Sequence, residues 1–211
     1  MIKAALFDLD GVIVDTEPQY TIFWRRVGHK YFPDDENFAT NLKGQTLSYI
    51  NDTYFPNDID LQRQIQQSLA DFEAQMDYPY VSGIVEYVNK IKVSRITTAI
   101  VTSSNKEKMD HLYRSHPELP DLFTNIFTAE DTERSKPAPD CYVNAARHLG
   151  LKTNECLVFE DSFNGIQAGC ASGAKVVGVT TSNSTEAIQG LCDFVIPNFN
   201  ELCIDDAILK M

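Results

Sequence analysis

Positive charge is scarce in this sequence. Its 211 residues include 18 lysines and arginines against 30 aspartates and glutamates, which gives a formal net charge of −12 at pH 7. Nucleic acids and anionic membrane surfaces bind clustered basic side chains, and this composition offers few of them. We therefore expect neither a nucleic-acid partner nor a membrane surface. Any phosphate site must draw its positive charge from a metal, a lysine or backbone N–H groups.

Long hydrophobic runs and an ordered cysteine pattern are also missing. No apolar run approaches the roughly 20 residues that a membrane span needs, and Asp8 interrupts the apolar start too early for a signal peptide. The cysteines contain no CxxC pair, which favours neither a disulfide framework nor a zinc site. We expect reduced thiols in a cytoplasmic monomer. The five are Cys141, Cys156, Cys170, Cys192 and Cys203.

Short apolar segments rich in β-branched and aromatic residues alternate with helical patterns. This alternation predicts an α/β fold with a parallel sheet covered on both faces. The predicted strands cover residues 4–7, 96–101, 125–128, 156–159, 175–179 and 194–196. The predicted helices cover residues 84–92, 106–115, 139–148, 163–171 and 185–189.

Residues 16–81 break the alternation. Tyr20, Phe23 and Trp24 recur at helical spacing, as do Leu61 and Ile65 further on, with polar residues between them. This is the pattern of amphipathic helices. We predict a helical insertion after the first strand, with turns at residues 33–35 and 56–58.

Acidic pairs follow two of the predicted strands. Asp8 and Asp10 come directly after the first strand, where one carboxylate beside a cation can act as a nucleophile and the other as a general acid and base. An Asp-rich turn is the alternative, whereas a calcium-binding EF-hand loop would not follow a strand. Glu160 and Asp161 follow a later strand, and adjacent carboxylates there call for a hard cation such as Mg²⁺.

Hydroxyl groups and a lysine follow the other strand ends of interest. Thr102 and Ser103 are suited to bind an anion with their hydroxyls and N–H groups, although Ser104 or Asn105 can instead cap the next helix. Lys136 precedes Pro137, which restricts the backbone, so its ammonium can be held near a phosphate rather than left in solvent. Open α/β sheets bind ligands at the carboxyl ends of their strands.

The order and the amino-acid sequences of these four segments resemble the motifs of the haloacid dehalogenase superfamily, and within it those of the β-phosphoglucomutase-like phosphatases. The resemblance rests on Asp8-x-Asp10-Gly11, Thr102, Lys136-Pro137 and Glu160-Asp161 with Gly165. It implies a Rossmann-like core at residues 1–15 and 82–211, with a helical cap at residues 16–81.

The resemblance also implies a reaction and the residues that perform it. The enzyme would be a phosphoric monoester hydrolase in which Asp8 forms an aspartyl-phosphate, while Asp10 protonates the leaving oxygen and then activates water. Thr102, the N–H of Ser103 and Lys136 would hold the phosphoryl group. The Mg²⁺ ligands would be Asp8, the Asp10 carbonyl, Asp161 and, directly or through water, Glu160.

Two positions depart from the mutases of this family and favour hydrolysis. Tyr20 stands where they carry a histidine, and Leu47 stands where they carry a phosphate-binding arginine. Arg25 or Arg26 could replace that arginine, so β-phosphoglucomutase remains the alternative. A phospho-ligand sensor without catalysis is a third possibility. The expected substrate is a small phosphorylated metabolite, a sugar or polyol phosphate. Candidate contacts to it are Thr16, Tyr20, Trp24, Lys43 and Gln45.

Overall fold

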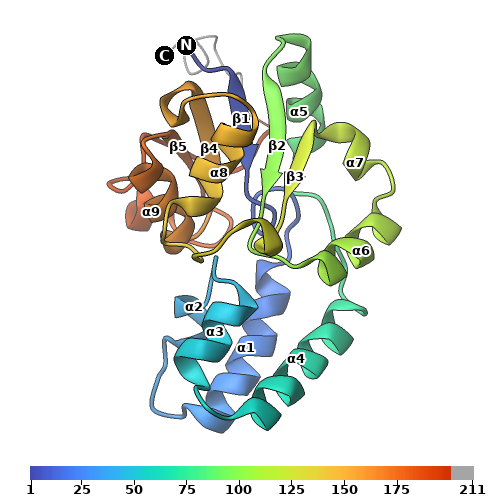
Figure 1. The fold of residues 1–211 in the computed structure, drawn as a ribbon, viewed down its shortest axis with the longest axis vertical. Helices are drawn as coiled ribbons and strands as arrows, with labels where there is room; N and C mark the ends of the chain where they lie inside the picture. Colours follow the sequence, from blue (N-terminus) through green and yellow to red (C-terminus); the bar gives the residue numbers. More distant parts are fainter. Residues whose placement is uncertain (201–211) are drawn as a thin grey trace.

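Six parallel strands form one sheet in the computed structural model, which describes residues 1–200 (Figure 1). The strand order is β3-β2-β1-β4-β5-β6, and β1 pairs in parallel with β2 on one side and β4 on the other. The predicted α/β fold with a Rossmann-like parallel sheet is confirmed. The strands are β1 (Ala4–Phe7), β2 (Thr97–Val101), β3 (Asn125–Phe127), β4 (Cys156–Glu160), β5 (Lys175–Val179) and β6 (Phe194–Ile196).

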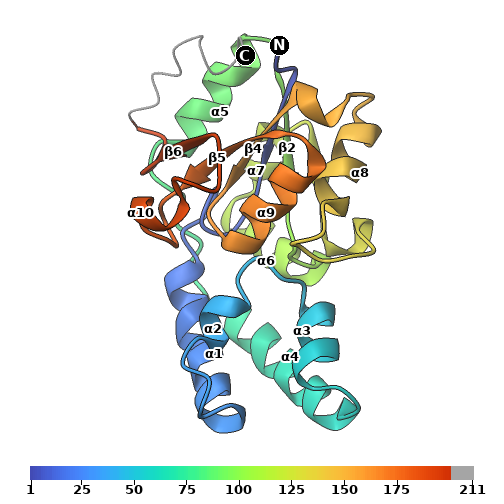
Figure 2. The ribbon, with the colours of Figure 1, turned by 90° about the vertical axis from the view of Figure 1, so that its left-hand side faces the viewer.

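Helices cover both faces of this sheet (Figures 1 and 2). Alternate strand residues point to opposite faces, so Ala5 and Phe7 pack in one hydrophobic cluster while Ala4 and Leu6 pack in the other. The first face is covered by α5 (Ile84–Val93), α6 (Lys106–Ser115) and α7 (Leu119–Leu122). The second is covered by α8 (Asp140–His148), α9 (Phe163–Ser172) and α10 (Thr185–Ile188). Short 3₁₀ turns lie at η1 (Ala129–Asp131) and η2 (Thr153–Glu155).

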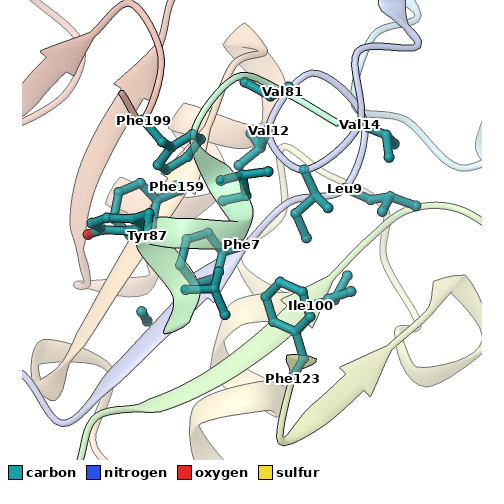
Figure 3. Packing of buried hydrophobic residues seen from close by; sticks show 14 of the residues in the cluster. Phe7, Leu9, Val12, Val14, Val81, Tyr87, Ile100, Phe123, Phe159 and Phe199 are labelled. Carbon is teal, nitrogen blue, oxygen red and sulfur yellow. The ribbon is translucent and has the colours of Figure 1, made fainter. Parts of the chain in front are cut away.

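Aromatic packing fixes the two central strands near their carboxyl ends (Figure 3). The rings of Phe7 and Phe159 stack with their centroids 4.6 Å apart, and Tyr87 packs edge-on against both. Both phenylalanines are fully buried. Phe7 immediately precedes Asp8, and Phe159 immediately precedes Glu160. The packing of the two rings therefore also fixes the backbone that carries these two acidic residues.

The helical insertion has a hydrophobic cluster of its own. It contains α1 (Glu17–Tyr31), α2 (Phe38–Asn41), α3 (Leu47–Tyr54) and α4 (Ile59–Glu73), which lie together below the sheet in Figure 1. The predicted turns at residues 33–35 and 56–58 separate α1 from α2 and α3 from α4. The cluster comprises Phe23, Trp24, Phe38, Ala39, Leu42, Ile50, Phe55, Ile65 and Leu69.

Several boundaries differ slightly from the sequence-based expectation. Strand β4 continues through Glu160, so this carboxylate belongs to the strand rather than to the loop after it.

Cys141 and Cys156 are buried free thiols, whereas Cys170 is exposed. Cys203 and the last part of the expected core, residues 201–211, lie outside the described residues. Of the helices in the described chain, none is both long and apolar enough to cross a bilayer.

Candidate active site

The predicted site residues converge at the carboxyl edge of the three central strands. Asp8 follows β1, Thr102 follows β2, and Glu160 ends β4. These strands are neighbours in the sheet, so residues far apart in the sequence meet there. Gly11 turns the chain after β1 with φ of +75°, and a Cβ atom on it would lie 2.0 Å from Asp161 Oδ2. Only glycine permits both this conformation and this approach.

Lys136 forms the centre of a buried charge triad. Its Nζ donates hydrogen bonds to Asp8 Oδ1 at 2.7 Å and to Glu160 Oε1 at 2.6 Å. Tyr142 on α8 donates to the same Glu160 oxygen at 2.8 Å. Burial opposes the charge of Lys136, but the two carboxylates outweigh it and raise the pKa of Lys136 well above its usual value. The ammonium therefore remains charged, and Glu160 anchors it beside Asp8.

Asp8, Glu160 and Asp161 place one carboxylate oxygen each within 4.8 Å of one another. Burial raises the pKa of Asp8 to about 7, with Lys136 opposing the shift and Glu160 adding to it. Burial, followed by the charges of Glu17, Glu160 and Asp8, raises the pKa of Asp161 well above its usual value. One lysine does not neutralise three buried carboxylates. Their oxygens suit a hard divalent cation, which would restore the balance of charge.

Asp161 is oriented by the loop after β5. Its side chain accepts a hydrogen bond from the Ser182 hydroxyl, and its carbonyl oxygen accepts one from Asn183 Nδ2 at 2.8 Å. Glu160 is held in turn by the N–H groups of Asp161 and Ser162, at 3.1 and 3.3 Å from its Oε2. Both acids thus have fixed positions before any ligand binds.

Asp10 lies at the boundary between the sheet core and the insertion. Its carboxylate accepts hydrogen bonds from Lys108 Nζ, from the Thr16 hydroxyl and, at 3.0 Å, from the Ser104 hydroxyl. Thr16 is fully buried and immediately precedes α1, so it connects Asp10 to the first helix of the insertion. Asp10 is more exposed than Asp8, with 17% of its side chain accessible.

Thr102 and Ser103 border the same space as Asp8. The Thr102 hydroxyl accepts a hydrogen bond from the N–H of Ser104 at 3.0 Å, and the Ser103 hydroxyl donates to the carbonyl of Gly44 in the insertion at 2.9 Å. The alternative capping role belongs to Asn105, whose side chain accepts the N–H of Lys108 at the start of α6. Asn105 therefore caps α6, and this role requires neither Thr102 nor Ser103.

A cavity of about 1000 Å³ separates the strand ends from the insertion. Its lining includes both candidate catalytic acids, Asp8 and Asp10, and four of the five candidate substrate contacts, namely Tyr20, Trp24, Lys43 and Gln45. Thr16 does not line it; its hydroxyl instead donates a hydrogen bond to Asp10. Lys43 Nζ lies 2.9 Å from Glu17, a buried carboxylate whose pKa is raised by burial against the opposing charge of Lys43.

The cavity lining also shows where the residues that bear on mutase activity lie, namely Leu47, Arg25 and Arg26. Leu47 lines it, so this position presents an apolar side chain. Arg25 and Arg26 are exposed and absent from the lining, and Arg26 borders a separate groove between α1 and α4. Neither arginine stands where it could replace the missing one.

Sequence reasoning missed Lys108, Tyr142 and Glu73, three buried residues at or near the site. A signal existed for two of them. Lys108 lies one helical turn before the buried Leu112, and Tyr142 lies at helical spacing from the buried Ala145, so each polar side chain shares the apolar face of its helix. Such a side chain needs a buried partner.

Comparisons with known proteins identify the family to which the chain belongs. Residues 2–173 match the haloacid dehalogenase-like hydrolase family model, and the chain belongs to that family. The predicted enzyme class, a phosphoric monoester hydrolase, is confirmed, as is the predicted likeness to β-phosphoglucomutase-like members. A solved β-phosphoglucomutase from Clostridium difficile superimposes with a TM-score of 0.81 at 24% identity, covering 100% of this chain and 96% of that one.

Two relatives with assigned activities are phosphatases. Validoxylamine A 7'-phosphate phosphatase of Streptomyces hygroscopicus is 27% identical, over 89% of this chain and 90% of its own. Glycerol-1-phosphate phosphohydrolase 2 of Saccharomyces cerevisiae is 26% identical, over 95% of this chain and 84% of its own.

Proposed function

We propose that this protein is a Mg²⁺-dependent phosphatase that hydrolyses a small sugar or polyol phosphate through an aspartyl-phosphate on Asp8. The observation that carries the proposal is the position of Asp8. Its buried carboxylate borders the cavity, contacts Lys136 at 2.7 Å and lies beside Asp161. Nucleophile, fixed cation and cation-binding acid thus meet at one place, as phosphoryl transfer requires.

The reaction divides between Asp8 and Asp10. An Asp8 oxygen attacks phosphorus, the ester P–O bond breaks, and the leaving oxygen takes a proton from Asp10. Water then gives a proton to Asp10 and attacks the aspartyl-phosphate, which releases inorganic phosphate and restores the Asp8 carboxylate. Lys136, Thr102 and the N–H of Ser103 hold the phosphoryl oxygens throughout. These positive and hydrogen-bonding groups meet the charge that spreads over those oxygens.

The acidic cluster fits a bound Mg²⁺. Asp8, Asp161 and the Asp10 carbonyl would hold it, with Glu160 close by and engaged chiefly with Lys136 and Tyr142. When bound, the ion supplies positive charge that offsets the repulsion between an anionic nucleophile and an anionic phosphate. The raised pKa values of Asp8 and Asp161 support this proposal, since both carboxylates are poorly compensated without a cation.

The insertion acts as a cap in this proposal and recognises the leaving group. Three hydrogen bonds join residues 43–46 to the sheet core, from Ser103 to Gly44, from Asn164 to Lys43 and from Thr46 to Ser135. The cavity wall supplied by the insertion carries the amides Gln45, Asn51, Gln62 and Gln66. Amides bind hydroxyl groups as donors and acceptors, which supports a polyhydroxylated leaving group such as the glycerol in the name of one relative.

Hydrolysis is favoured over mutase activity because Leu47 replaces the expected arginine, and the cavity cations Lys43 and Arg134 are already paired with Glu17 and Asp140. A mutase must bind a bisphosphate in two orientations, and Leu47 offers no charge for this purpose. Incubation with β-glucose 1-phosphate and a trace of the 1,6-bisphosphate should release inorganic phosphate without efficient formation of glucose 6-phosphate. Efficient isomerisation would overturn the assignment.

The nucleophile is tested by replacing Asp8 with asparagine. We expect Asp8→Asn to abolish phosphate release from p-nitrophenyl phosphate with Mg²⁺, because the amide is a poor nucleophile and a poor ligand. Asp15→Asn is the matched control, since Asp15 is exposed within the same segment. Undiminished turnover by Asp8→Asn would show that the reaction does not pass through Asp8.

A further inference from the structure

Lys108 is a buried cation of α6 that contacts the proposed acid and base. Its side chain is 3% exposed, and its Nζ contacts both carboxylate oxygens of Asp10. The helix start is fixed by Asn105, whose Oδ1 accepts the Lys108 N–H at 2.9 Å. A buried ammonium is destabilising unless it is paired, so Lys108 and Asp10 constrain each other strongly.

The other donors to Asp10 divide between its two oxygens. The Thr16 hydroxyl donates to Oδ1 and the Ser104 hydroxyl to Oδ2. Lys108 alone among these donors is charged, and it alone contacts both oxygens. Charge-assisted hydrogen bonds are roughly twice as strong as neutral ones. Lys108 therefore contributes most to the orientation of this carboxyl group.

The insertion closes over the same ammonium. Lys108 Nζ lies 4.5 Å from the centroid of the Tyr20 ring on α1, within the range of a cation–π contact. The Tyr20 hydroxyl donates to Glu73 Oε1 on α4 at 2.7 Å, which fixes the ring. Lys108 thus lies between an acid of the sheet core and an aromatic ring of the insertion. Its contact with Tyr20 is the one of these three that joins the two parts.

We propose that Lys108 is a positioning residue for Asp10, and that Tyr20 and Glu73 make its contact with Asp10 depend on the insertion lying against the core. The inference rests on the proposed function, in which Asp10 gives a proton to the leaving oxygen. That transfer requires the carboxyl group within hydrogen-bond reach of the leaving oxygen. Without Lys108 the Asp10 side chain samples other rotamers, and fewer substrate encounters have an acid in place.

The test compares two leaving groups. The alkoxide of glycerol 1-phosphate must be protonated as it leaves, whereas the nitrophenolate of p-nitrophenyl phosphate leaves without a proton. The value of kcat/KM covers the steps through leaving-group departure, so the later attack of water does not enter. General acid catalysis contributes about 10²–10⁴-fold. We expect Lys108→Met to lower kcat/KM for glycerol 1-phosphate roughly 10- to 100-fold more than for the aryl ester.

Two controls separate positioning from general damage. Lys106→Met removes an exposed lysine of the same helix and should leave both values unchanged. In an Asp10→Asn background, Lys108→Met should cause no further selective loss, because a residue that acts through another shows non-additive effects. Tyr20→Leu should cause a smaller selective loss in the same direction, and it provides the test if Lys108→Met fails to fold.

Equal losses for the two esters in Lys108→Met, or no loss, would overturn the inference. A selective loss that persists in full in the Asp10→Asn background would overturn it as well. These outcomes differ from failure of the proposed function, which would appear as full activity of Asp8→Asn toward both esters.

Discussion

Replacing Lys136 with methionine should destabilise the protein strongly in the absence of metal. Methionine keeps much of the length of the side chain but removes the ammonium that contacts Asp8 at 2.7 Å and Glu160 at 2.6 Å. These carboxylates are 5% and 0% exposed, so water does not replace the lost contacts. Breaking a buried ion pair by removing one partner costs about 3–5 kcal/mol.

The corresponding shift in melting temperature follows from the size of the chain. For a protein of about 150–250 residues, 1 kcal/mol corresponds to about 2–4 °C. The loss at Lys136 should therefore lower Tm by roughly 6–20 °C. Thermal unfolding followed by circular dichroism, at neutral pH with EDTA, measures it. Lys106→Met, an exposed lysine, should melt within a degree or two of the unmodified protein.

Addition of Mg²⁺ should recover part of this loss, because the ion compensates the same carboxylates and binds the folded state. A Lys136→Met protein that melts with the unmodified one in EDTA would refute the reasoning, since it would mean that the two carboxylates need no buried cation. In Lys136→Met, Tyr142 would still donate its hydrogen bond to Glu160 at 2.8 Å. If this bond alone stabilises the buried Glu160 carboxylate, the decrease in Tm should be about 6 °C, the lower end of the expected range.

Two further predictions concern the same cluster. The pKa of Asp8 is raised from 3.8 to about 7 in the metal-free fold, so the folded state binds this proton more tightly than the unfolded state. This contribution to stability is present below about pH 4 and is lost as the pH rises toward 7. The Tm of EDTA-treated protein should fall over that window, and Mg²⁺ should raise Tm more at pH 7.5 than at pH 5; equal increments would contradict this account. Separately, a Cβ on Gly165 would lie 1.8 Å from Glu160 Oε1, whereas one on Gly190 meets open space. Gly165→Ala should therefore displace Glu160 and lower kcat at least about 10-fold, while Gly190→Ala should not; unchanged kcat in Gly165→Ala would show that the position of Glu160 is unimportant.

The sequence by itself determined the sheet and the main candidate residues, because both depend on short-range patterns. Strands of four or five buried residues end immediately before Asp8, before Thr102 and at Glu160. In a parallel sheet every strand presents its carboxyl end at the same edge, so residues that follow strands meet there whatever their separation in the chain. The helical insertion was equally visible, since its helices carry an apolar face at regular spacing.

Only the tertiary structure decided how these residues are held. Lys108 reaches Asp10 across 98 positions of sequence, and Glu73 reaches Tyr20 across 53. No local pattern contains such pairings, because they depend on how elements far apart in the sequence pack against one another. A helical period can place Lys108 on a buried face, but the identity of its partner follows from packing between elements. The hydrogen bonds from Lys136 and Tyr142 to Glu160 likewise follow from packing between elements far apart in the sequence.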